Sequence, residues 1–388
     1  MACVFVMKKL LIIGAEVQPI PPIMGGAVEC LVASLLKSEQ IRADYEITVV
    51  SPAFPGVEEA AKEYPNIHFK FIKIGTMLDR MIDFADLFLR RFFDKTSGIA
   101  YIHKVCNLLK KEQYDLVIIE NRPYFGKFLK NVCSSPVLLH LHNDFINRDT
   151  RHLHEILPYY SGMIVVSDYL RKRCSEVYSG LIEVVYNGID LASFLPGNQE
   201  VSGTIVYAGR IVKEKGVLEL VRAFSRLKGA DIRLMIIGGY DPNDVDNKDF
   251  IQEYERLLTL DKRIETVGVK PYKELHKYYQ KAAIGVVPSI VNEAFGLAAL
   301  EMMAAGLAVV VSDAGGLMEI VKADCGIVVG REKLEEGLYD ALEALLKDAE
   351  RRKKLAAKAQ ERAKEFSEEN YVRNFASALK DIMSRGGL

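Results

Sequence analysis

The feature that most constrains the fold is a series of short apolar runs separated by amphipathic segments, and this series occurs twice. In the first half of the chain the runs are 10–15, 47–52, 69–74, 116–121, 137–142 and 163–168. In the second half they are 204–210, 233–239, 264–269, 284–289 and 308–313. Runs that are continuously apolar indicate parallel strands covered by helices on both faces. The sequence therefore predicts an α/β protein with two Rossmann-like, doubly wound parallel-sheet domains facing a central cleft.

The length of the chain agrees with two domains. Its 388 residues, 49% of them hydrophobic, exceed the size at which a single core stops growing. Turn residues cluster at 186–203, between the two series. We predict a first domain over 1–195 and a second over 196–367, and we expect the last helix, 368–388, to pack back on the first domain.

The composition argues against several classes of function. The formal net charge is −1, so bulk electrostatics do not favour binding to nucleic acid. The six cysteines are scattered without a Cys-x-x-Cys pair, which disfavours a zinc site or a disulfide framework and favours reduced thiols in the cytoplasm. No apolar run has the length of a membrane span. The apolar part of 8–16 is too short for a signal peptide, and we interpret it as a buried strand.

Two loops carry groups that can bind phosphate. Gly25 and Gly26 stand directly before an amphipathic helix, where backbone amides and the positive helix end attract anions; a flexible turn is the alternative. They do not form the G-x-G-x-x-G fingerprint of dinucleotide-binding proteins. Arg210 and Lys215 lie where the chain leaves the first strand of the second series, and two cations there suit a diphosphate. The alternative for this pair is that both side chains are simply solvated.

A pair of glutamates stands in an unusual setting. Glu293 and Glu301 are eight positions apart, and Glu301 lies in a run that is otherwise almost entirely apolar or small. A buried carboxylate is costly unless it has a polar partner. Gly296 marks a helix start, so the amides of 295–297 are free to bind a ligand, and carboxylates accept hydrogen bonds from the vicinal hydroxyls of sugars. The alternative is a partly exposed helix with two solvated acids.

These residues and their surroundings resemble a known family. The stretch 292–321, NEAFGLAALEMMAAGLAVVVSDAGGLMEIV, is similar to the E-x7-E signature of the retaining family-four glycosyltransferases, which have the GT-B fold. Further motifs follow in the family's order: GGAVE, HLHND, VVSDYL, YNGID, AGRIVKEKG, VGVKPYKEL and VVPS. The ordered set extends from Gly25 to Val321 and is highly specific as a set.

The resemblance implies roles for the matching residues of the second domain, which would bind the nucleotide-sugar donor. Glu293 would bind hydroxyls of the donor sugar, helped by amides of Phe295, Gly296 and Leu297. Glu301 would hold the ribose hydroxyls of the nucleotide. Arg210 and Lys215 would bind the diphosphate, and the base would rest near Val269 and Lys270.

The first domain would lie on the acceptor side and would supply Gly25, Gly26 and a histidine near the donor sugar. HLHND offers both His140 and His142 on one face of a strand, and the resemblance favours His142. Ala294 stands where proline is common in the family, which we expect to alter the donor-binding loop and not the chemistry.

Two other segments resemble functional motifs, but we interpret both as structural. Asp244-x-Asp246 resembles the metal motif of the other large glycosyltransferase fold. Because it lies in a polar loop, we interpret it as a solvated turn. The segment 81–105 combines aromatic residues with Arg90, Arg91 and Lys95. We interpret this segment as a helix that packs in the core of the first domain. A membrane-facing or acceptor-binding helix is the alternative.

The sequence thus predicts transfer of a sugar from a UDP-, GDP-, ADP- or dTDP-linked donor to a hydroxyl of a glycan, lipid-linked or small-molecule acceptor. The resemblance implies retention of the anomeric configuration without a metal or another cofactor. We expect a cytoplasmic hexosyltransferase of cell-surface polysaccharide or glycoconjugate synthesis, with a peripheral membrane contact left open. The alternatives are a nucleotide-sugar epimerase on the same fold and an inactive surface or coat protein.

Overall fold

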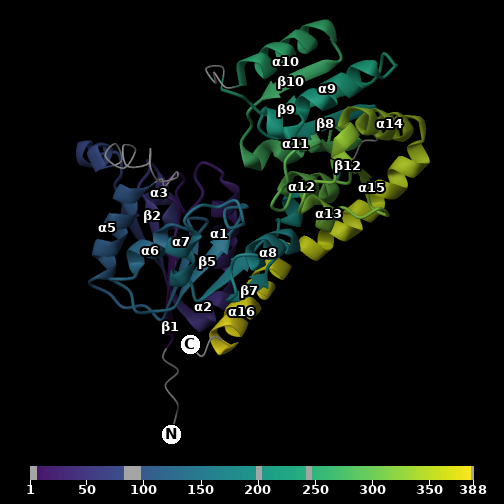
Figure 1. Cartoon of the computed structure of the whole chain (residues 1–388). Helices are drawn as coiled ribbons and strands as arrows, with labels where there is room; N and C mark the ends of the chain where they lie inside the picture. The colour runs from purple at the N-terminus through teal and green to yellow at the C-terminus, as the bar shows by residue number, and fades with distance from the viewer. Residues whose placement is uncertain (1–6, 83–97, 198–202, 242–246, 386–388) are drawn as a thin grey trace. The chain divides into compact units, whose positions relative to one another are not determined.

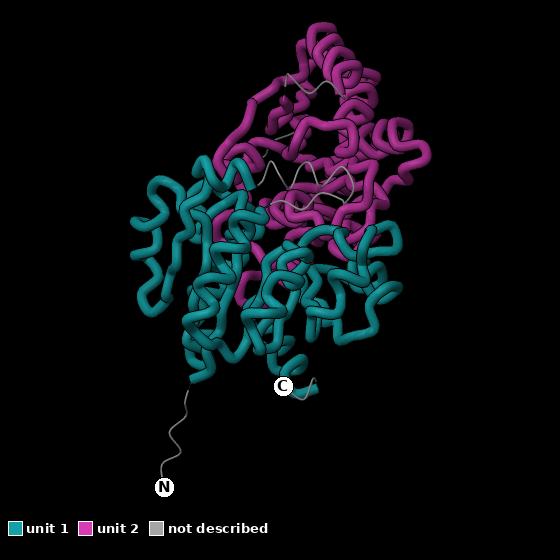
Figure 2. The backbone as a smooth tube through the Cα atoms, turned by 60° about the vertical axis from the view of Figure 1, so that its left-hand side comes forward, with its two compact units in different colours: residues 1–186, 371–388 teal, residues 187–370 magenta. Residues whose placement is uncertain are grey.

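The computed structural model describes residues 7–82, 98–197, 203–241 and 247–385. The chain divides into two compact units, which Figure 2 shows in different colours. Unit 1 comprises residues 1–186 and 371–388, and unit 2 comprises residues 187–370. None of the described helices combines the length and the apolar composition that a bilayer-spanning segment needs.

Unit 1 is built on a seven-stranded sheet in the order β3-β2-β1-β4-β5-β6-β7. All neighbouring strands run parallel. The strands are β1 (Lys8–Ile13), β2 (Tyr45–Pro52), β3 (Ile67–Ile72), β4 (Leu116–Glu120), β5 (Val137–Leu141), β6 (Gly162–Val165) and β7 (Leu181–Val184). Every residue of β4 and β5 is buried, as the continuously apolar runs predict.

Helices cover this sheet and close its core (Figure 1). They are α1 (Ala27–Lys37), α2 (Glu39–Asp44), α3 (Val57–Ala61), α5 (Ile99–Leu109), α6 (Phe125–Leu129), α7 (Leu153–Ile156), α8 (Asp168–Ser175) and α16 (Glu368–Arg385). From Tyr371 onward α16 belongs to unit 1. Its side chains Tyr371, Phe375 and Leu379 lie in the same apolar cluster as Leu10 and Ile12 of β1, so the end of the chain completes the core of unit 1.

Unit 2 contains a six-stranded parallel sheet in the order β10-β9-β8-β11-β12-β13. Its strands are β8 (Thr204–Ala208), β9 (Arg233–Ile237), β10 (Ile264–Gly268), β11 (Ile284–Val287), β12 (Ala308–Ser312) and β13 (Ile327–Val329). Its helices are α9 (Val217–Arg226), α10 (Lys248–Leu260), α11 (Leu275–Tyr279), α12 (Leu297–Ala304), α13 (Leu317–Ile320), α14 (Leu334–Lys347) and α15 (Ala349–Ala363). The predicted fold class, two doubly wound parallel sheets, is confirmed.

In each sheet the strand order reverses at one point, and there the chain leaves neighbouring strands toward opposite sides. In unit 1 this point lies between β1 and β4, and in unit 2 between β8 and β11. Open α/β sheets bind ligands outside the carboxyl ends of the strands at such points. The loops that follow β1, β4, β8 and β11 are therefore the places to look for a functional site.

Candidate functional site

In unit 2 the loops after β8 and β11 bring together two residues that are 78 positions apart in the sequence. The Lys215 ammonium lies 2.5 Å from Oε1 of Glu293, and the Ser289 hydroxyl donates to the same oxygen. The backbone carbonyl of Glu293 accepts a hydrogen bond of 2.8 Å from the N–H of Gly316. Glu293 is thus held through both its carboxylate and its backbone, and it is not a freely solvated acid.

Arg210 lies in the same loop as Lys215, but its side chain has a different environment. Its carbonyl accepts a hydrogen bond of 2.6 Å from the Tyr207 hydroxyl, which fixes the backbone just after β8. Its side chain is exposed, and its guanidinium forms no ion pair with any residue that the structure describes. Lys215 is thus balanced by Glu293, and Arg210 is available to an anion from solution.

Gly216 allows the β8 loop to approach the β11 loop, and we expect its replacement to be costly. It has φ of +66°, and a Cβ at this position would lie 1.9 Å from the carbonyl oxygen of Pro288. Gly216→Ala should destabilise the protein by at least about 2 kcal/mol, because strain and a backbone clash add. Thermal unfolding of the full chain measures this.

Gly330→Ala is the matched control, since nothing lies within 4 Å of an added Cβ there and its φ is −72°. Equal melting temperatures for the two variants would show that the β8 and β11 loops do not need this close approach.

The N-terminus of α12 presents backbone donors next to Glu293. Gly296 has φ of +119° and precedes the helix, and the N–H groups of Gly296 and Leu297 donate to no acceptor within the described part of the chain. The ring of Phe295 is buried, with its centroid 5.8 Å from that of Phe366. The side chain of Phe295 therefore anchors the loop, while the helix end offers amides to a ligand. Ala294 is half-buried in the same loop.

Glu301 lies within α12 and is only 4% exposed. The hydroxyl of Tyr279, at the end of α11, donates a hydrogen bond of 2.9 Å to its Oε2. Burial raises the pKa of Glu301 to about 8, and the Tyr279 hydrogen bond opposes this rise. Glu301 is therefore a buried acid with one polar partner, so the solvated-face alternative is wrong for this residue.

Val269 and Lys270 follow β10, two strands away from β8 in the same sheet. Val269 is 77% exposed, and the Lys270 ammonium lies 5.8 Å from the centroid of the Tyr278 ring. Both residues thus stand at the same edge of the sheet as Arg210, since parallel strands end at one edge.

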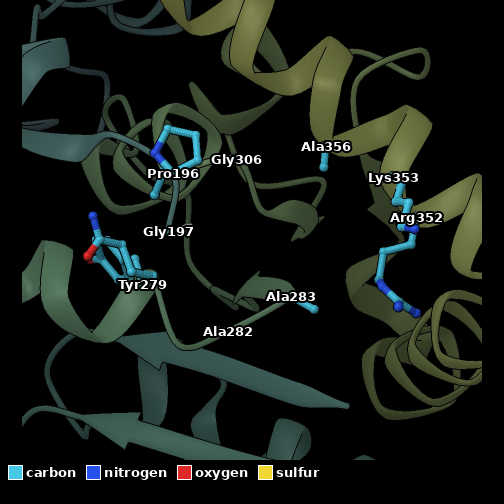
Figure 3. A pocket seen from close by; sticks show the side chains of 11 residues that line it. Pro196, Gly197, Tyr279, Ala282, Ala283, Gly306, Arg352, Lys353 and Ala356 are labelled. Atoms are coloured by element: carbon cyan, nitrogen blue, oxygen red, sulfur yellow. The ribbon is translucent and has the colours of Figure 1, made fainter. Parts of the chain in front are cut away.

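A cavity of about 160 Å³ opens elsewhere in unit 2 (Figure 3). It is lined by Pro196, Gly197, Tyr279, Gln280, Ala282, Ala283, Ala305, Gly306, Arg352, Lys353 and Ala356. Ala283 directly precedes β11 and Gly306 lies two residues before β12, so the cavity lies toward the amino ends of these strands. It is separate from the loops that carry Lys215 and Glu293.

In unit 1 several charged residues lie near the point between β1 and β4 where the strand order reverses. Arg122, just after β4, donates to both carboxylate oxygens of Glu16, at 2.7 and 3.2 Å. Glu29 of α1 is 6% exposed, and burial followed by the charge of Glu120 raises its pKa. A Cβ on Gly26 would lie 1.9 Å from Oε2 of Glu29, so the carboxylate folds over the start of α1. Gly25 precedes it with φ of +79°.

The two strand histidines of unit 1 both turn toward Glu120. Nδ1 of His140 lies 2.9 Å from Oε2 of Glu120, and Nε2 of His142 lies 3.2 Å from the same oxygen. The two ring nitrogens are 3.2 Å apart. The backbone N–H of His142 donates to the side-chain carbonyl of Asn121 at 3.1 Å. All these side chains are buried, and burial together with the charge of His140 lowers the pKa of His142 to about 4.

Several of these residues are not among the sequence-predicted site residues, namely Glu16, Glu29, Glu120, Arg122, Tyr279 and Ser289. Glu120 carried a usable signal, because it ends a fully apolar strand run next in space to HLH. Asp244 and Asp246 lie outside the described residues, as do Arg90, Arg91 and Lys95 of the segment 81–105.

Comparison with known families decides the family of this chain. Residues 193–362 match the family described as Glycosyl transferases group 1, and residues 31–193 match Glycosyltransferase Family 4. The chain belongs to the group 1, family 4 glycosyltransferases. It is therefore an enzyme of the glycosyltransferase class, as the order of its motifs indicates.

Individual relatives agree with this assignment. An uncharacterized glycosyltransferase of Methanocaldococcus jannaschii is 29% identical over 57% of this chain and 63% of its own length. A lipopolysaccharide 1,2-N-acetylglucosaminetransferase of Salmonella typhimurium is 25% identical over 96% of this chain and 98% of its own length. The solved structure of Anabaena HepE in complex with UDP-glucose has a TM-score of 0.72 and 18% identity, covering 96% of this chain and all of that one. That last likeness shows the GT-B fold.

Proposed function

We propose that this glycosyltransferase moves a sugar from a nucleotide-diphosphate sugar to a hydroxyl acceptor, with unit 2 binding the donor. The observation that carries the proposal is the Lys215–Glu293 pair beside the unpaired guanidinium of Arg210 and the α12 amides. A carboxylate next to cations and N–H donors suits a ligand that joins sugar hydroxyls to a diphosphate. No nucleic acid, cofactor or metal enters this reaction.

In this proposal the reaction depends on stabilising the leaving diphosphate. The bond between the anomeric carbon and the phosphate oxygen breaks, and the acceptor oxygen bonds to that carbon. Arg210, Lys215 and the amides of Gly296 and Leu297 stabilise the negative charge that grows on the leaving oxygen. Loss of contact between Glu293 and Lys215 as the donor enters would release the ammonium toward the phosphates. The acceptor hydroxyl passes its proton to the leaving phosphate on the same face, which retains the anomeric configuration.

The remaining donor contacts are assigned by position. Glu301 would accept hydrogen bonds from ribose hydroxyls in its ionised form, and Val269 and Lys270 would border the base. In unit 1, His142 and the amides of Gly25 and Gly26 would serve the same reaction. His140 lies as close to Glu120 as His142 does, so the choice between the two histidines rests on the family motif.

Two relatives support a proposal for the donor and acceptor classes. The Anabaena structure holds UDP-glucose and the Salmonella enzyme is a lipopolysaccharide transferase, so we propose a UDP-linked hexose and a cell-surface glycan or lipid-linked acceptor. The five cysteines within the described part of the chain are free thiols, which supports a reducing compartment such as the cytoplasm, at or away from a membrane surface.

The test is nucleotide release from UDP-, GDP-, ADP- and dTDP-sugars by the full chain, with and without acceptor glycans. We expect slow hydrolysis of one donor without an acceptor. Arg210→Ala should lower kcat/KM for that donor at least about 10-fold, because a charge-assisted hydrogen bond to phosphate is lost. The control is Arg256→Ala, since Arg256 is an exposed residue of α10 that pairs with Glu253 of the same helix. Release that is equally fast in both variants would contradict the proposed diphosphate site.

A further inference from the structure

Glu120, His140 and His142 form one buried cluster in unit 1, although the proposed transfer reaction gives a role to His142 and none to Glu120 and His140. Glu120 ends β4, and His140 lies on the neighbouring strand β5, with His142 two residues further on the same face. Their side chains are 1%, 0% and 4% exposed. Each contributes one ligand atom, and these atoms all lie within 4.8 Å of one another.

The three closest atoms form a compact triangle. Oε2 of Glu120, Nδ1 of His140 and Nε2 of His142 are separated by 2.9, 3.2 and 3.2 Å. Nδ1 of His140 also lies 3.2 Å from Oε1 of Glu120, so both rings face the same carboxylate. A cation at the centre of this triangle would bond to all three atoms at once.

The described charges around the cluster are mostly negative. Among the residues that the structure describes there, the carboxylates of Glu16, Glu29 and Glu120 lie with the guanidinium of Arg122, which pairs with Glu16. Glu29 and Glu120 are both buried, and they interact unfavourably with each other. If the three glutamates are ionised and both histidines are neutral, these described groups sum to −2, the charge that one divalent cation balances.

We propose that Glu120, His140 and His142 bind a divalent transition-metal ion of the zinc type in unit 1. Two histidines and one glutamate are an established donor set for zinc, with bonds of about 2.0–2.1 Å that place tetrahedral ligand atoms about 3.3 Å apart. The observed separations of 2.9–3.2 Å need only a slight opening to reach this geometry. The fourth position is left to a water molecule.

The role of the ion would be to fix the two histidines and tie the end of β4 to β5. Nδ1 of His140 and Nε2 of His142 would be the bonding nitrogens, so each ring would keep a proton on its other nitrogen. Those atoms, and the hydroxyl of Tyr371 on α16, are buried without a hydrogen-bond partner in the described part of the chain. The charge of Glu120 acts on the Tyr371 hydroxyl, which therefore belongs to the same polar region.

The test uses the full chain without a histidine tag, stripped of metal with EDTA and titrated with Co²⁺. We expect one equivalent to bind with the intense visible absorption of tetrahedral Co²⁺, and Zn²⁺ to displace it. Glu120→Gln keeps the volume but removes the anionic ligand, and it should weaken Co²⁺ binding at least about 100-fold.

The matched control is His154→Gln. His154 and His152 lie near Glu155, a second place in the described chain where two histidines meet one carboxylate. The Co²⁺ affinity and spectrum of His154→Gln should equal those of the wild type. Unchanged affinity in Glu120→Gln, or loss in His154→Gln, would overturn the proposal. If Glu120→Gln does not fold, the wild-type spectrum decides, because absent or octahedral-type absorption would also overturn it.

Discussion

Replacing Glu293 with glutamine should reduce kcat for glycosyl transfer by about 100-fold or more while leaving the fold intact. The carboxylate is the partner of the Lys215 ammonium at 2.5 Å and also accepts from Ser289. Glutamine keeps the shape but removes the charge that pairs with Lys215 and that we propose binds sugar hydroxyls. Loss of one preorganised electrostatic contact costs about 100- to 1,000-fold in kcat. Steady-state kinetics with the donor identified by nucleotide release measures this.

Glu332→Gln is the control for this experiment, because Glu332 is an exposed glutamate of the same unit. It should show wild-type kinetics. If Glu293→Gln retained kcat within a few-fold of the wild type, then Glu293 would hold only the local structure, and the sugar-binding assignment would fail. A circular dichroism spectrum and melting temperature equal to those of the wild type separate lost chemistry from lost folding.

The sheets were predictable from the sequence because most of their strands are buried on both faces. Such strands appear as continuous apolar runs, as in β4 and β12, where every residue is buried. The sequence analysis did not identify β7 and β13. Both are last in their sheets and short, and most of their residues are only partly buried, so they lack a long apolar run.

The candidate site was predictable in its residue types and not in its pairings. A glutamate in an apolar helix must have a polar partner, and this reasoning singles out Glu301. It does not identify Tyr279, because that partner lies on another helix, 22 positions away. The Lys215–Glu293 pair likewise depends on the adjacency of β8 and β11, which only the strand order supplies.

In unit 1 the sequence identifies the histidines but not the carboxylates near them. The histidines of HLHND attract attention through a family motif, whereas Glu120 and Glu29 look like ordinary acids in the sequence. Their importance appears only when β4, β5 and the start of α1 are assembled, because the charge of Glu120 then acts on Glu29 and on both histidines. Charge balance within a buried region is a property of the fold, and it cannot be read from the total net charge of −1.

Glu301 should make the stability of unit 2 fall as the pH rises from about 5 to 8. Its pKa is raised from 4.5 to about 8 by burial, so in this window the folded chain keeps a proton that the unfolded chain has released. The unfolded state then binds fewer protons than the folded state. The free energy of unfolding therefore decreases by up to about 1.4 kcal/mol per pH unit from this group, and the full contribution is present only below its unfolded pKa.

Glu301→Gln isolates this effect, because its side-chain carbonyl can still accept from Tyr279 while it cannot ionise. The melting temperature of the variant minus that of the wild type should rise by about 3–5 °C per pH unit between pH 5 and 8. Calorimetry of the full chain measures this difference, and Glu332→Gln should show none. Parallel melting curves for Glu301→Gln and the wild type would mean that Glu301 is ionised throughout. In that case a cation or further donors, and not the Tyr279 hydroxyl alone, would have to hold the buried carboxylate.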